Sequence, residues 1–180
     1  MRAPSSSAVR KWIPDHTRAF TISFTAEEKL GKLRVVPDTT LDRVEPRSVR
    51  LFLLPGGDRW EGEYPRAQLD GVLAALRRAD VPVAAICGAT IALARAGLLD
   101  DRAHTSNERA YLEQHAPEYR GGARYVDELA LRDRGIITAS GVGPVEFARE
   151  IFEELGVLSE TDRPVWYHLF KYGRLPEPAA

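Results

Sequence analysis

A short buried strand that runs straight into a helix constrains the fold of this chain more than any other feature. Residues 81–86 form an apolar, β-branched run of the kind that makes a buried strand. Cys87 and Gly88 follow at once, and a helical pattern over residues 91–96 ends at Gly97. Cys87, the only cysteine among 180 residues, is therefore predicted to lie on a sharp elbow at the N-terminus of a helix.

The rest of the chain continues the alternation of strands and helices. Strands are predicted at residues 19–24, 49–54, 124–126, 129–131 and 136–139, and helices at 68–79, 145–155 and 165–172. A polar joint at 159–164 is expected before the last helix, and Asn107 is expected to cap another helix that ends near His115. This order predicts an α/β sandwich with a mostly parallel sheet, and residues 1–180 are expected to form a single domain.

The predicted position of Cys87 at the start of a helix indicates a reactive thiol. At a helix N-terminus, unpaired N–H groups and the helix dipole favour thiolate over thiol. Gly57 and Gly88 follow two strands whose carboxyl ends are expected at one edge of the sheet. Their backbone N–H groups could bind a single oxyanion, as acyl or carbonyl chemistry requires. The alternative is that Cys87 is a small buried hydrophobe and that both glycines only make turns.

Charge and composition exclude several classes of function. The 25 Lys and Arg residues nearly balance 26 Asp and Glu residues, and a net charge of -1 gives no field that attracts nucleic acid or an anionic membrane. A single cysteine excludes an intramolecular disulfide and a cysteine-rich zinc site. The first residues lack the apolar segment of a signal peptide, and no apolar run reaches membrane-spanning length, so a cytoplasmic protein is expected.

Three segments carry a resemblance to a known family. They read LLPGGDRW at 53–60, AAICGATIALARAGLLDDRAHTSN at 84–107 and VDELALRDRGIITASGVGPVEFAREI at 126–151. In order and spacing they resemble the PfpI family, and within it the YdeA-like branch. This family belongs to the class I glutamine amidotransferase-like superfamily, which also contains the Parkinson-disease-associated deglycase. The resemblance covers about residues 18–157 and extends to the C-terminal helix.

The resemblance implies a flavodoxin-like three-layer α/β/α sandwich with Cys87 at the nucleophile elbow. It also implies an oxyanion hole from Gly57 and Gly88, a homodimer, a small-molecule substrate, and neither a metal nor an organic cofactor. The expected pocket consists of Asp58, Thr90, Asn107, Ser140 and Gly141.

The expected activity is that of a cysteine-dependent hydrolase, deglycase or glyoxalase-like enzyme acting on a small carbonyl or amide compound. His104 is the candidate for moving protons near the thiol. Residues 139–143 lack the His-x-Glu pair of a true glutamine amidotransferase, so glutamine amidotransfer is not expected. The alternatives are a cysteine-based sensor of oxidative stress and a non-catalytic stress protein with the same fold.

Two elements of the family pattern are absent before residue 19: an apolar strand and an acidic segment whose glutamate contacts the cysteine. The expectation is that the DNA upstream of Met1 encodes both, and that the 180-residue form folds poorly alone. If the chain does start at Met1, three residues become candidates for the acidic partner of Cys87: Glu27, Glu28 and Glu61.

Overall fold

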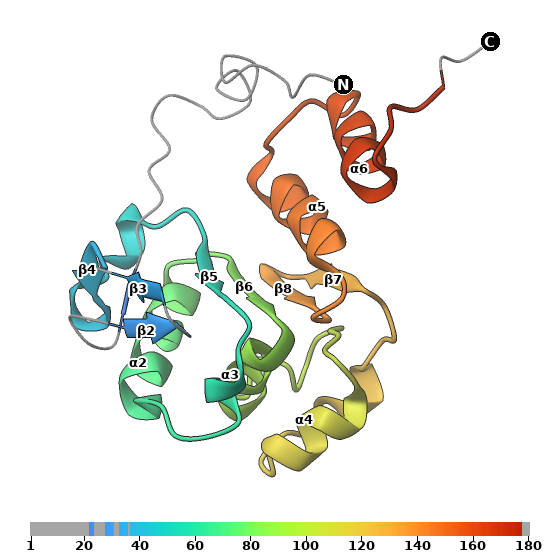
Figure 1. Ribbon diagram of the computed structural model, residues 1–180. Coiled ribbons are helices and arrows are strands. Elements are labelled where there is room, and N and C mark those ends of the chain that lie inside the picture. Colours follow the sequence, from blue (N-terminus) through green and yellow to red (C-terminus); the bar gives the residue numbers. More distant parts are fainter. Residues whose placement is uncertain (1–21, 24–27, 31–32, 36, 178–180) are drawn as a thin grey trace.

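The centre of the protein is a four-stranded sheet with the order β5-β6-β8-β7. The computed structural model describes residues 22–23, 28–30, 33–35 and 37–177 (Figure 1). Strands β5 (Phe52–Leu54), β6 (Val83–Ile86) and β8 (Ile136–Ala139) are parallel, and β7 (Ala130–Asp133) is antiparallel to β8. The prediction of a mostly parallel sheet is confirmed.

Helices cover both faces of this sheet (Figure 1). On one face, α2 (Arg66–Arg78), α3 (Thr90–Arg95) and α4 (Arg109–His115) share a core with inward side chains of β5 and β6. On the other face, α5 (Pro144–Leu155) packs Phe147 and Ile151 against Ala84 and Ile137. Alternate strand residues therefore serve opposite cores, which gives three layers.

The last helix, α6 (Asp162–Tyr172), packs on α5, and the Trp166 ring lies 4.7 Å from the Phe152 ring, centroid to centroid. It begins three residues before the predicted start, inside the segment expected to be a polar joint. Pro164 is compatible with this start because the N–H groups of the first turn have no acceptor within the helix. Buried Glu146 on α5 accepts hydrogen bonds from Tyr167 and Lys171, at 2.8 and 2.7 Å.

Short strands precede the central sheet. β1 (Ile22–Ser23) pairs in parallel with β4 (Thr39–Thr40), and β2 (Glu28–Leu30) pairs antiparallel with β3 (Leu33–Val35). The remainder of the strand predicted at 19–24 lies outside the described residues. In the described part of the chain, β5 pairs with β6 alone.

The described helices are all too short or too polar to cross a membrane.

Candidate active site around Cys87

Cys87 lies between β6 and α3 with a φ of +58°, in the left-handed region. It opens the 3-10 turn η4 (Cys87–Ala89), which leads directly into α3. This conformation costs an L-residue about 1–2 kcal/mol, and such strain collects at functional sites. The thiol-bearing residue is only partly buried. The strand–turn–helix elbow is therefore present as predicted, and Cys87 is not a fully buried core residue.

Thr90 holds the elbow in place from inside the protein. Its hydroxyl donates to the backbone oxygen of Cys87 at 2.7 Å, so the 2.7 Å bond with Ser106 Oγ has Ser106 as donor. Thr90 is 0% exposed. The prediction that Thr90 lines the pocket is wrong, because its side chain is fully buried and its hydroxyl already makes these two hydrogen bonds.

Three glycines allow backbone segments to approach Cys87 closely. A Cβ at Gly56 would lie 2.9 Å from Cys87 Cβ, and a Cβ at Gly141 would lie 3.0 Å from Cys87 Sγ. A Cβ at Gly88 would lie 2.5 Å from the backbone oxygen of Gly57. The loops after β5 and β8 therefore converge on the elbow. Gly56 is not among the predicted site residues, although the sequence shows two consecutive glycines, Gly56 and Gly57, at the end of a predicted strand.

Gly57 and Gly88 are neighbours in space, and each stands at the start of a 3-10 turn. Gly57 directly precedes η3 (Asp58–Trp60), and Gly88 is the second residue of η4. N–H groups at such positions have no acceptor within their own turn. The local structure is therefore compatible with two free donors beside the thiol, and their role as an oxyanion hole stays a prediction.

Asn107 connects the thiol to the loop after β8. Its Nδ2 donates to Cys87 Sγ at 3.5 Å, and its Oδ1 accepts the backbone N–H of Gly141 at 2.9 Å. The prediction that Asn107 caps α4 is wrong, because the N-cap position belongs to Glu108 and carries no side-chain cap. Both ends of the Asn107 amide are used at the site instead.

Tyr111 and Glu61 form a polar pair beside the elbow. Tyr111 donates its phenolic proton to Glu61 Oε1 at 2.8 Å, and a Cβ at Gly88 would lie 3.3 Å from the Tyr111 oxygen. Burial, this bond and the negative charges of Glu61, a Cys87 thiolate and Asp58 hold the pKa of Tyr111 well above its ordinary value.

Tyr111 is not among the predicted site residues, because a tyrosine on a helix that packs on the core has no local signal in the sequence. Of the three acidic candidates, Glu61 lies near the site but contacts Tyr111. Glu27 lies outside the described residues, and only the backbone of Glu28 is described.

His104 lies in the core. Its Nδ1 lies 2.9 Å from the backbone oxygen of Arg102 and must donate to it, so its Nε2 accepts the Tyr119 hydroxyl at 2.5 Å. Burial lowers the pKa of His104 and raises the pKa of Tyr119 to about 12, so the histidine is neutral and the tyrosine keeps its proton. Both ring nitrogens are taken by groups of the core, so neither is available to the thiol. His104, which forms an isolated β-bridge with Tyr125, therefore belongs to the core and is not brought to Cys87.

Asp58 and Ser140 lie in the two loops that flank the elbow. Asp58 is exposed and opens η3, close enough to act electrostatically on Tyr111. Ser140 donates its N–H to Leu129 O and accepts the N–H of Gly143, both at 3.0 Å, which fixes the loop that carries Gly141. The structure thus gathers Cys87, Gly57, Gly88, Asn107 and Gly141, with Asp58 and Ser140 in the same loops. Within the described residues, no three His, Cys, Asp or Glu side chains come together as metal ligands would.

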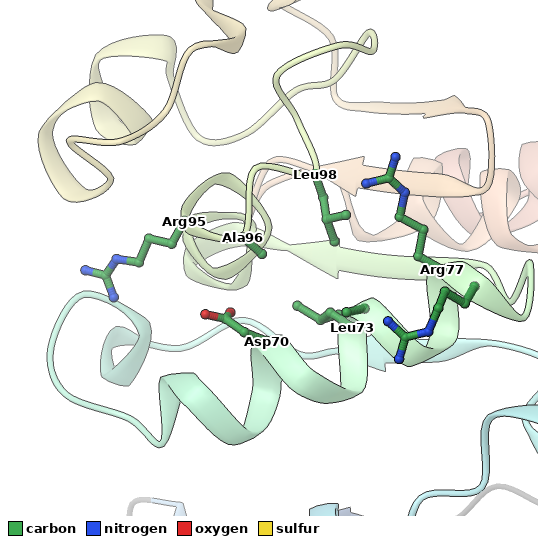
Figure 2. Close-up of a pocket in the computed structure, with 8 residues that line it drawn as sticks. Asp70, Leu73, Arg77, Arg95, Ala96 and Leu98 are labelled. Carbon is green, nitrogen blue, oxygen red and sulfur yellow. The ribbon is translucent and has the colours of Figure 1, made fainter.

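A separate pocket of about 510 Å³ lies between α2 and the end of α3. Figure 2 shows Arg95 and Arg77 on either side of Leu73 and Ala96 in this pocket. Cys87 is not among the lining residues, so this pocket is not the candidate active site.

Known proteins similar to this chain share its fold and much of its sequence. A thiJ/pfpI family protein from Bacillus anthracis has a TM-score of 0.74 and 37% identity, covering 80% of this chain and 68% of that protein. This likeness confirms the flavodoxin-like fold.

Two curated Bacillus subtilis proteins are also similar. "Uncharacterized protease YoaZ" is 39% identical over 142 residues, which are 79% of this chain and 67% of that protein. "Uncharacterized protease YdeA" is 32% identical over 130 residues, 72% of this chain and 64% of that protein. This chain therefore spans about two thirds of the length of these relatives. The model of the DJ-1/PfpI family matches residues 19–154, the range that holds β5, the elbow and the Gly141 loop. On this evidence the chain belongs to the DJ-1/PfpI family.

Proposed function

We propose that this protein is a cysteine-dependent hydrolase that acts on a small carbonyl or amide compound, with Cys87 as the nucleophile. The observation that carries the proposal is the left-handed φ of +58° at a partly buried cysteine between a strand and a helix. Strain of this kind presents a nucleophile at the end of a sheet. The naming of two relatives as uncharacterized proteases supports a hydrolase class without identifying a substrate.

In the proposed reaction, the Cys87 thiolate attacks the carbonyl carbon. A C–S bond forms, and the electron pair of the C=O π bond moves to oxygen, where the N–H groups of Gly57 and Gly88 stabilise it. With an amide, the amine leaves with a proton from water, and a second water then hydrolyses the thioester and restores the thiolate. With an aldehyde, the same attack gives a hemithioacetal, the first adduct of deglycase or glyoxalase-like chemistry.

Asn107 supports this step by a hydrogen bond to the sulfur. Its Nδ2 donates to Sγ at 3.5 Å, which gives the attacking sulfur a hydrogen-bond donor. The position of this donor is fixed, because Oδ1 of the same amide holds the N–H of Gly141. Asn107 thereby links the thiol to the loop that carries Gly141.

Proton transfer in this proposal relies on solvent. His104 is committed to Arg102 and Tyr119 in the core, so it supplies no general base. General acid–base catalysis is typically worth about 10²- to 10⁴-fold in rate. We therefore expect slow turnover, below that of hydrolases with a cysteine–histidine pair.

A redox sensor is the second candidate, favoured by the fact that Cys87 is partly exposed and is the only cysteine in the sequence. Oxidation would stop at sulfenic or sulfinic acid, because no second cysteine in the chain can form a disulfide with it. The donors proposed for a substrate oxyanion would stabilise the oxygens of the oxidised sulfur equally well.

Two parallel measurements separate these candidates. The first is turnover of methylglyoxal and of simple amides, and the second is peroxide titration followed by intact mass, each with wild type and Cys87→Ala. Turnover that disappears in the variant supports the hydrolase. Stoichiometric oxidation at Cys87 without turnover supports the sensor, and neither response supports a non-catalytic protein. We also propose a cytoplasmic homodimer, which sedimentation of the purified protein and fractionation of cells would test.

A further inference from the structure

Tyr111 presents an unused hydrogen-bond acceptor beside the proposed oxyanion hole. Its only proton is donated to Glu61 Oε1 at 2.8 Å, which leaves the lone pairs of the phenolic oxygen for another partner. That oxygen would lie 3.3 Å from a Cβ at Gly88, the residue whose N–H is proposed to bind the substrate oxygen. A substituent on the atom next to the substrate carbonyl carbon would therefore be able to reach the Tyr111 oxygen.

Three contacts hold this acceptor in one place. The Tyr111 ring packs against the core that α2, α3 and α4 share, and the ring of His115 lies 4.8 Å from it, centroid to centroid. Glu61 fixes the hydroxyl rotor, and Glu61 itself follows the η3 turn with its N–H on Asp58 O at 3.1 Å. Such a preorganised group costs little to use in binding.

The phenol also keeps its proton. Burial and the neighbouring carboxylate raise the pKa of Tyr111, so the oxygen acts as a neutral acceptor with its proton committed to Glu61. A substrate substituent that can only accept a hydrogen bond would meet the lone pairs of the Tyr111 oxygen and gain no bond. A hydroxyl or an amide N–H could donate a hydrogen bond to that oxygen.

We propose that Tyr111 is a specificity-determining residue that selects substrates with a hydrogen-bond donor on the atom next to the carbonyl carbon, such as 2-hydroxy carbonyl compounds and primary amides. Glu61 is its positioning residue, because it sets the direction of the phenolic proton. This inference rests on the proposed function, since it assumes that a carbonyl group binds at Cys87.

The test uses two small aldehydes of similar size, glycolaldehyde with a 2-hydroxyl group and propanal with a methyl group in its place. Each forms a hemithioacetal: the C–S bond forms and the thiol proton ends on the former carbonyl oxygen. Protection of Cys87 from iodoacetamide, measured on the Cys87 peptide, gives an apparent affinity that does not depend on turnover. Because hydration of each aldehyde is the same for every variant, the ratio of the two affinities is compared between variants.

In Tyr111→Phe, the affinity for glycolaldehyde relative to propanal should fall by about 3- to 10-fold, which is the value of one neutral hydrogen bond. Glu61→Gln, which can still accept the phenolic proton, keeps the wild-type ratio, and Glu61→Ala moves it toward that of Tyr111→Phe. Tyr172→Phe, an exposed tyrosine on α6, is the matched control and leaves the ratio unchanged.

A ratio that is the same in wild type and in folded Tyr111→Phe overturns the inference and leaves the proposed function standing. If neither aldehyde protects Cys87 in the wild type, the proposed carbonyl chemistry itself fails, and the inference fails with it.

Discussion

The side-chain amide of Asn107 donates to Cys87 Sγ at 3.5 Å, across a sequence separation of 20 residues. The same amide accepts the N–H of Gly141 at 2.9 Å. One residue thus joins the thiol at the end of β6 to the loop after β8. The candidate site depends on this link, because the described residues offer the sulfur no histidine in its place.

Asn107→Asp keeps an acceptor for Gly141 and removes the donor to the sulfur. A negative charge at this place also disfavours the thiolate. We expect the rate of Cys87 alkylation by iodoacetamide at neutral pH to fall by about 10-fold or more, the value of a hydrogen bond to a charged group. The rate is measured by quenching the alkylation at a series of times and determining the mass of the Cys87 peptide. An unchanged rate would show that Asn107 does not act on the sulfur.

Gly88→Ala should damage both reactivity and stability. The new Cβ would lie 2.5 Å from the backbone oxygen of Gly57, so the loop that carries Gly57 must move away. We expect loss of turnover and a lower free energy of unfolding by about 1–3 kcal/mol. Gly71→Ala on the exposed face of α2 is the control, since nothing lies within 4 Å of its Cβ and helix propensity favours alanine by about 0.5–1 kcal/mol. A Gly88→Ala protein as stable and active as Gly71→Ala would contradict this geometry.

The strain at Cys87 can be measured in the absence of the thiol. Cys87→Gly and Cys87→Ala both remove the sulfur, but only glycine adopts a φ of +58° without cost. Chemical denaturation should show that the glycine variant is more stable than the alanine variant by about 1 kcal/mol. This is the cost of the left-handed conformation for alanine, less the larger loss of backbone entropy when glycine folds. The reverse order would mean that the elbow is unstrained.

His104 should affect the stability of the protein and not the thiol. Tyr119→Phe leaves Nε2 of His104 without its donor, which should cost about 1–3 kcal/mol, while alkylation of Cys87 keeps the wild-type rate. The pKa of folded His104 lies below its ordinary value of 6.5. The unfolded chain therefore binds the proton more readily, and the free energy of unfolding should fall as pH drops below about 6.5.

The same residue allows a control for this pH dependence. Glutamine at position 104 can still donate to Arg102 O and accept from Tyr119, but it does not titrate. Denaturation midpoints of His104→Gln should therefore change less than those of wild type between about pH 7.5 and pH 5.5. If alkylation of Cys87 were slower in folded Tyr119→Phe than in wild type, His104 would have to act on the thiol after all.

The sequence predicts most of the strands and helices, because hydrophobic periodicity is a local property. The strand predicted at 124–126 is wrong, since Gly121–Arg124 form a 3-10 turn and Tyr125 makes only an isolated bridge with His104. The strand before Cys87, the stripe of α2 and the amphipathic α5 are each visible within a dozen residues. Errors arise where a polar side chain has several possible partners. Asn107 is a residue type that often caps helices, and Thr90 follows the cysteine where a pocket residue is expected. Each side chain instead bonds to groups that only the tertiary structure brings near. The Tyr111–Glu61 pair, separated by 50 positions, has no local signature at all.

The most direct test of the central claim is the mass of the intact protein during turnover of an activated acyl ester such as p-nitrophenyl acetate. If Cys87 is the nucleophile, one acyl group should appear on the Cys87 peptide and decay by hydrolysis while product continues to form, and Cys87→Ala should show neither event. Product formation that is unchanged in folded Cys87→Ala, or an acyl group that water never removes, would contradict a cysteine-dependent hydrolase.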